Sequence, residues 1–191
     1  MQSAAYELSY LQAGVELLEP YLMSQDIYWP IQATPNAGDP PYPSLTLGGL
    51  LLAQARLSST TLPIDLQPIQ DRVQHEFDAL QTHWRVAWER KAVREFHARL
   101  KQWADYLDEY RSDPENNVDR YAYEVSRRVM LNLLDPYAGK APSSEKELVH
   151  RLDMLLQAVF LPGDFIWDSW QKSAFSPQLY WYLYGRLRES M

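Results

Sequence analysis

The chain has 191 residues, of which 46% are hydrophobic and 23% charged, and its net charge is −7 at pH 7. This composition supplies a core and excludes intrinsic disorder, while the absence of cysteine excludes disulfides, thiolate metal sites and cysteine nucleophiles. The acidic balance disfavours nucleic acid and anionic membranes as partners. We see no secretory signal and no apolar stretch long enough to span a bilayer. We therefore expect a cytoplasmic protein in which residues 1–191 form a single helical domain.

The N-terminal segment carries the signals of a helix with an internal interruption. Ser3 is a preferred cap residue, and apolar side chains recur at helical spacing from Leu8 to Leu22. Pro20 falls within this stripe, where it removes an amide donor and clashes with the preceding turn. We therefore expect a first helix that kinks or ends near Glu19.

A proline-rich stretch follows. Residues 25–44 contain five prolines and the turn signal Asn-Ala-Gly-Asp, which together predict a long Pro-rich loop. Tyr28 and Trp29 are apolar anchors that favour packing of this loop against the protein. Directly after the loop, Thr46 is expected to cap a short helix over residues 47–57.

The next segment is the longest element that the sequence predicts. Residues 66–112 contain one early proline and no glycine, so a helix capped by Asp65 would extend for roughly 70 Å. Its apolar side chains recur at a mean step of about 3.67 residues rather than the roughly 3.5 of a left-handed coiled coil. Several consecutive steps of four rotate the apolar stripe, so the two halves face different directions. Either the helix is continuous, or it is kinked between Trp84 and Ala92. We favour the continuous helix because neither glycine nor proline lies there.

Two further helices are predicted after this segment. Pro114 ends the long helix, and the apolar pattern then predicts a helix over residues 115–134. Ser144 and Glu147 have the spacing of a capping box at the start of the next helix. The core side of that helix is expected to include Leu155.

The C-terminal part completes the predicted fold. Pro162 and Gly163 end the preceding helix, and two short helices are expected to begin at Asp164 and Ser176. No stretch alternates apolar and polar residues with a period of two, so we expect no strand. The sequence therefore predicts an all-α fold, a six- to seven-helix bundle around one long central helix at about 66–112.

One face of the long helix carries a basic strip. It consists of Arg90, Arg94, His97 and Lys101, at spacings of four, three and four residues. Such a strip is either a solvated helix face or an anion-binding site for phosphate, nucleic acid or an acidic partner. Because no aromatic side chain is interleaved on this face to stack on bases, nucleic acid is the least favoured of these partners.

Aromatic residues crowd the end of the chain. They include Trp167, Trp170, Tyr180, Trp181 and Tyr184, which we take as interface candidates. The alternative is burial against the long helix, because a helix that is apolar all round is either buried or makes an external contact. A protein partner or a homodimer is the partner that this pattern predicts.

No pattern in the chain is typical of catalysis, a metal or a cofactor. There is no phosphate-binding glycine loop and no nucleophile elbow, and Glu147-x-x-His150 occurs without the second copy that a di-iron bundle needs. The leading hypothesis is a non-catalytic interaction or adaptor protein. A second is an anion- or nucleic-acid-binding bundle that uses the basic strip. A third is an enzyme with a pocket under the Pro-rich loop, where Tyr28, Trp29 and Asp39 meet a histidine.

Overall fold

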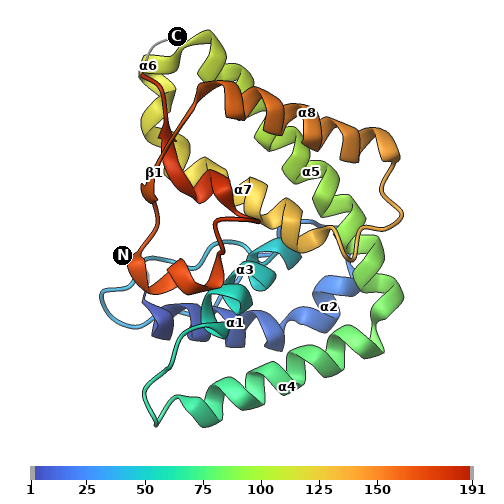
Figure 1. Ribbon diagram of the computed structural model, residues 1–191. Coiled ribbons are helices and arrows are strands. Elements are labelled where there is room, and N and C mark those ends of the chain that lie inside the picture. The colour runs from blue at the N-terminus through green and yellow to red at the C-terminus, as the bar shows by residue number, and fades with distance from the viewer. Residues whose placement is uncertain (1–2, 190–191) are drawn as a thin grey trace.

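The computed structural model describes residues 3–189, and their fold is mainly α-helical, as predicted (Figure 1). Eight α-helices and one two-stranded sheet occur in this described part of the chain. The helices are α1 (Ala4–Glu16), α2 (Leu18–Met23), α3 (Leu47–Ser58), α4 (Gln67–His83), α5 (Arg85–Ser112), α6 (Pro114–Asn117), α7 (Tyr121–Leu134) and α8 (Ser143–Val159). The strands are β1 (Phe160–Phe165) and β2 (Tyr184–Leu187), and 3₁₀ turns cover Val118–Arg120, Ser169–Ala174 and Trp181–Leu183.

Helix α5 connects two groups of elements. It contacts α2, α3 and α4 from the N-terminal part and α6, α7 and α8 from the C-terminal part. Helix α3 packs on α1, α5 and α7, so it lies between the two groups. In Figure 1, α7 and α8 lie beside α5 in the upper part of the molecule, and α1, α2 and α4 lie in the lower part. None of the helices among residues 3–189 is both long and apolar enough to cross a bilayer.

The favoured prediction of one continuous helix over residues 66–112 is wrong, and the alternative of a break between Trp84 and Ala92 is correct, because Trp84 separates α4 from α5. Its backbone leaves helical geometry at φ −101° and ψ 26°. Across this bend the rings of Phe77 and Trp88 meet edge to face, with centroids 5.3 Å apart. In a straight helix these residues would be separated by a rise of roughly 16 Å. The bend thus brings Phe77 into the core, where α4 packs on α1.

The predicted helix starts are correct where a cap residue directly precedes the helix. The Ser3 hydroxyl accepts a hydrogen bond from the Tyr6 amide at 3.1 Å, and the Thr46 hydroxyl accepts one from Gly49 at 2.9 Å. The predicted interruption near Pro20 is found at Leu17, and Pro20 lies in the first turn of α2.

Two predicted caps are wrong. Helix α4 begins after Leu66, without a side-chain cap from Asp65. Helix α8 begins at Ser143 after Pro142, so Ser144 and Glu147 lie within the helix and make no capping box. Leu155, expected in the core, is 42% exposed.

The two C-terminal helices and the absence of strands are also wrong predictions. Helix α8 continues directly into β1, which pairs antiparallel with β2 and places Phe160 opposite Leu187. Gly185 has φ +152°, and a Cβ there would lie 2.2 Å from the carbonyl oxygen of Leu161. Aromatic side chains are enriched in strands, where they pack well against their neighbours. The Tyr- and Trp-rich segment from β1 to β2 therefore forms a strand pair with 3₁₀ turns between the strands, and not the two predicted helices.

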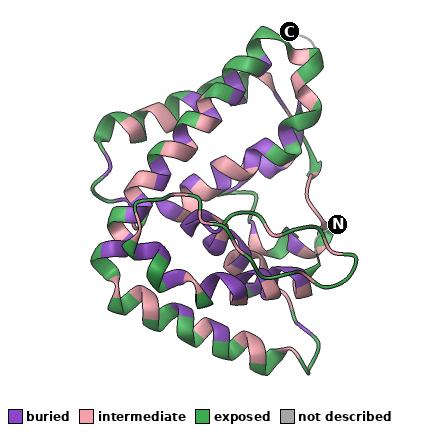
Figure 2. Cartoon of the chain, turned by 180° about the vertical axis from the view of Figure 1, so that it is seen from behind, coloured by how far each residue is buried: buried purple, intermediate pink, exposed green. Residues whose placement is uncertain are grey.

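The Pro-rich loop is fixed near both of its ends. Trp29 and Leu45 form an isolated antiparallel bridge, with hydrogen bonds of 3.0 and 2.7 Å. The Tyr6 hydroxyl donates to the Pro41 carbonyl oxygen at 3.2 Å, and the Tyr42 ring packs against the ring of Tyr6. Figure 2 shows this largely exposed segment crossing the face of the molecule that is turned away in Figure 1.

Candidate functional site: a cleft beside the Pro-rich loop

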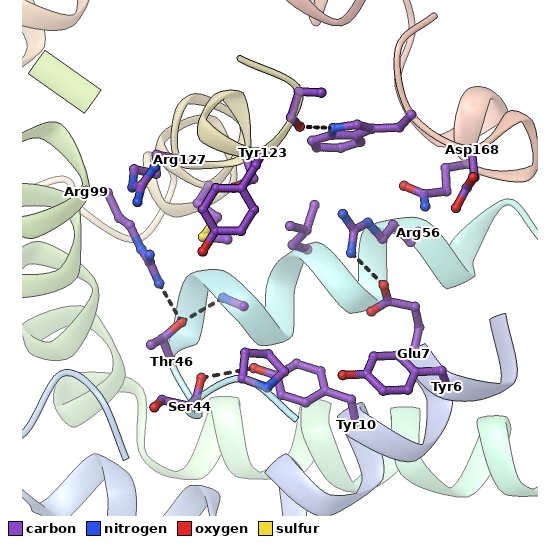
Figure 3. Close-up of a pocket in the computed structure, with 18 of the residues that line it drawn as sticks. Tyr6, Glu7, Tyr10, Ser44, Thr46, Arg56, Arg99, Tyr123, Arg127 and Asp168 are labelled. Atoms are coloured by element: carbon purple, nitrogen blue, oxygen red, sulfur yellow. Dashed lines mark hydrogen bonds and ion pairs between the residues drawn. The ribbon is translucent and has the colours of Figure 1, made fainter. Parts of the chain in front are cut away.

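A cleft of about 620 Å³ opens between α1, α3, α7, the end of the Pro-rich loop and the segment that follows β1 (Figure 3). Side chains that are more than 100 residues apart in the sequence, such as Glu7 and Asp168, both line this cleft. The charged and aromatic lining consists of Arg56, Arg99, Arg127, Glu7, Asp168, Trp167 and four tyrosines, Tyr6, Tyr10, Tyr28 and Tyr123.

One face of α3 forms the floor of the cleft. Thr46, Gly49 and Arg56 lie along it at spacings of three and seven residues, which places them on one side of the helix. The rise from Thr46 to Arg56 is about 15 Å. A Cβ on Gly49 would lie 2.6 Å from the Tyr10 hydroxyl, so a larger residue there would push this hydroxyl away from the floor. The cleft is therefore elongated, with different residues at its two ends.

Arg99 is held in place at the Thr46 end. Its Nη2 donates to Thr46 Oγ1 at 3.0 Å, and its Nε donates to Glu95 Oε1 at 3.1 Å. Glu95 is completely buried, and its other oxygen accepts a hydrogen bond from the Gly48 amide at 3.0 Å. The carboxylate thus lies behind Arg99 and at the N-terminus of α3, where the helix dipole stabilises negative charge. Arg99, and not Glu95, faces the cleft.

Arg127 is the second cation at this end, which we call the donor end (Arg99 and Arg127). Its Nε donates to Gln102 at 3.3 Å, and it pairs with Glu124, which is 4% exposed and does not line the cleft. Burial lowers the pKa of Arg127, but a guanidinium stays protonated at any physiological pH. Two guanidinium groups therefore face the cleft while their carboxylate partners are buried behind them.

The opposite end of the lining carries one guanidinium, Arg56, and two carboxylates, Glu7 and Asp168. Arg56 pairs with Glu7 at 2.5 Å, and its guanidinium carbon lies 5.0 Å from the centre of the Trp167 ring. Burial raises the pKa of the Glu7 carboxyl, and the neighbouring Arg56 opposes this rise. Asp168 makes no side-chain hydrogen bond or ion pair with residues 3–189, and the buried Oε1 of Gln171 has no hydrogen-bond partner there either. We call Asp168 and Gln171 the acceptor end.

The basic strip predicted from the sequence lies outside this cleft. Arg94 donates to Gln25 at 2.8 Å, His97 Nδ1 lies 2.7 Å from Glu145, and Lys101 donates to Asp105 at 2.6 Å. Arg90 is exposed. The structure thus brings three of the four side chains to local partners, and anion binding by this strip stays a prediction.

The aromatic interface candidates pack largely on one another and on α7. Tyr180 is buried, Trp181 meets Phe160 edge to face at 5.2 Å, and the Tyr184 hydroxyl donates to a backbone carbonyl at 2.6 Å. Trp167 lines the cleft and donates from Nε1 to the Ala122 carbonyl oxygen, while Trp170 is half-buried. A protein partner or homodimer that uses these residues stays a prediction.

The predicted pocket under the Pro-rich loop corresponds to this cleft only in part. Tyr28 lines it, but Trp29, Asp39 and the histidines do not. No group of three or more histidines and carboxylates within residues 3–189 is placed to hold a metal ion. Sequence reasoning missed Arg56, Arg99 and Arg127 as site residues. For Arg56 a signal was available, because it is the only lysine or arginine in residues 1–70.

No family model matches the sequence, and no curated protein or solved structure shows a significant similarity to it.

Proposed function

We propose that this protein is a small-molecule-binding protein, a helical bundle arranged around α5 that binds an organic anion in the cleft beside the Pro-rich loop. The observation that carries the proposal is the donor end. Arg99 and Arg127 present positive charge to the cleft, while Glu95 and Glu124, which balance them, do not line it. A carboxylate or phosphate bound there replaces water as the partner of both guanidinium groups.

The size and walls of the cleft support the same proposal. Ligand sites typically measure about 300–1,000 Å³, and this cleft falls within that range at about 620 Å³. Four tyrosines and Trp167 provide apolar faces with polar tips, which suit recognition of a small organic molecule. Tyr123 is 72% exposed at the mouth although it is a large aromatic residue.

The donor end is also rigid before any ligand binds. Arg99 is fixed by Thr46 and Glu95, and both Arg99 and Arg127 lie against Gln102. Side chains that are already ordered lose little conformational entropy when a ligand arrives. This supports a binding role for these arginines.

The proposal is tested with Arg127→Gln and a matched control, Arg90→Gln, which removes an exposed charge from the predicted basic strip. The protein is screened by thermal shift against a panel of small carboxylates and phosphates, and the hits are measured by calorimetry. A hydrogen bond to a charged group contributes about 1.5–3 kcal/mol, so we expect Arg127→Gln to weaken binding by about tenfold to a hundredfold. Arg90→Gln should leave the affinity unchanged.

Two results would overturn the proposal. One is that no member of the panel stabilises the protein. The other is that Arg127→Gln binds the anions as well as the wild type does. If Arg90→Gln alone loses binding, the basic strip is the anion site.

A further inference from the structure

We infer that the ligand of the cleft is an elongated zwitterion, with the chemistry of a short peptide of about three or four residues. Its carboxylate lies at Arg99 and Arg127, and its ammonium group lies at Asp168. This inference rests on the proposed function and adds the second half of the ligand to it.

The acceptor end lacks a cation of its own. Arg56 is the only basic side chain of the cleft lining at that end, and it is already engaged by Glu7 at 2.5 Å and by the Trp167 ring. The charges of Glu7, Arg56 and Asp168 therefore sum to about −1 at neutral pH. Asp168 is half-buried and has no side-chain partner within residues 3–189. A ligand ammonium supplies the missing positive charge.

An ammonium group suits this end because Asp168 offers a carboxylate without a cation. A primary ammonium has three donors, so it can bond that carboxylate and still donate to water. A hydrogen bond between two charged groups is stronger than one between neutral groups. An apolar or anionic group at this end would leave the Asp168 carboxylate unpaired.

The separation of the two ends sets the length of the ligand. Thr46 at the donor end and Arg56 at the acceptor end are ten residues apart on α3, a rise of about 15 Å. An extended peptide spans about 3.3–3.6 Å per residue, so three or four residues bridge the ends. In Figure 3 the Tyr123 ring lies between Arg127 and Arg56, above the part of the cleft that the backbone of a bound peptide would occupy. Its hydroxyl is placed to bond that backbone without selecting a side chain.

The inference is tested by calorimetry with four forms of one ligand. These are tetra-alanine with free ends, its N-acetyl form, its C-terminal amide and the doubly blocked peptide. We expect the free peptide to bind tightest and N-acetylation to weaken binding about tenfold or more, because it removes the charge that faces Asp168. Asp168→Asn should weaken binding of the free peptide to the level of the N-acetyl form and leave the N-acetyl form itself unaffected.

The matched control is Asp164→Asn, which removes an exposed carboxylate from the same segment outside the cleft and should change nothing. Because Asp168 makes no side-chain cap bond, circular dichroism should show Asp168→Asn as folded as the wild type. Equal affinity for the free and N-acetyl peptides, or failure of all four to bind, would overturn the zwitterion. If anions of the panel still bind in a manner that depends on Arg127, the proposed function stands without it.

Discussion

Replacing Gly48 with alanine tests how the donor end of the cleft is built. Gly48 is the second residue of α3, and its amide donates to the buried carboxylate of Glu95 at 3.0 Å. A Cβ at this position would lie 2.7 Å from the other oxygen of Glu95 and 3.2 Å from Met130 Cβ. Glu95 cannot swing away without losing Arg99, which pairs with it at 3.0 Å. The substitution therefore forces either α3 or the ion pair to move.

The opposing effects can be compared in size. Alanine gains about 1 kcal/mol over glycine in a helix interior. Against this gain, overpacking costs about 1–3 kcal/mol, and loss of a hydrogen bond to a charged group costs about 1.5–3 kcal/mol. If both losses occur, Gly48→Ala lowers the free energy of unfolding by roughly 1.5–5 kcal/mol. The same shift displaces Arg99, so affinity for the anion should fall as well.

Urea denaturation of Gly48→Ala measures the stability. Gly139→Ala is the control, because no atom lies within 4 Å of the added Cβ, and its stability should stay within about 1 kcal/mol of the wild type. A Gly48→Ala protein at least as stable as the wild type would refute the reasoning, since helix propensity would then outweigh the Glu95 contact.

Three further substitutions test other parts of the structure. Asp153→Asn should lower the unfolding free energy by about 3 kcal/mol in urea. It removes the negative charge and replaces one of the two oxygens that accept 2.7 Å bonds from Arg128 by an NH2 donor, and Arg128 is only 7% exposed; a loss below about 1 kcal/mol would contradict this. Gly185→Ala should separate β1 from β2, seen as loss of amide-exchange protection at Leu161, because the new Cβ meets a backbone oxygen; unchanged protection would count against the observed register. Burial lowers the pKa of Lys91 from 10.5 to about 8, so at this residue the unfolded state binds more protons between these values. The stability of the wild type relative to Lys91→Met should therefore rise from pH 8 to 10, since the buried tyrosines, whose pKa values are raised, affect both proteins alike; a constant difference would exclude the shift.

The bend at Trp84 shows where local sequence signals are insufficient. Glycine and proline are absent around it, and helix propensity alone favours continuity. The rotation of the apolar stripe did indicate two packing directions. The bend itself depends on the contact of Phe77 with Trp88 and on the packing of α4 against α1. Neither contact joins residues within one or two turns of the same helix, so local sequence signals do not report them.

The candidate site was even less accessible from the sequence. The predicted basic strip follows from spacing within one helix, whereas Arg56, Arg99 and Arg127 come from α3, α5 and α7. Helical periodicity relates residues within about two turns of each other and says nothing about side chains on separate helices. The pairing of Arg99 with Glu95 is the one element that the four-residue spacing could have indicated.

The sequence by itself determined the mainly helical character, the cap residues Ser3 and Thr46, and the position of the Pro-rich loop, because these depend on interactions between residues close in the chain. The tertiary structure decided the bend at Trp84, the pairing of β1 with β2 and the two-ended cleft. Each of these depends on long-range packing, which overrides local propensity when burial of large side chains contributes more free energy than a few residues of helix.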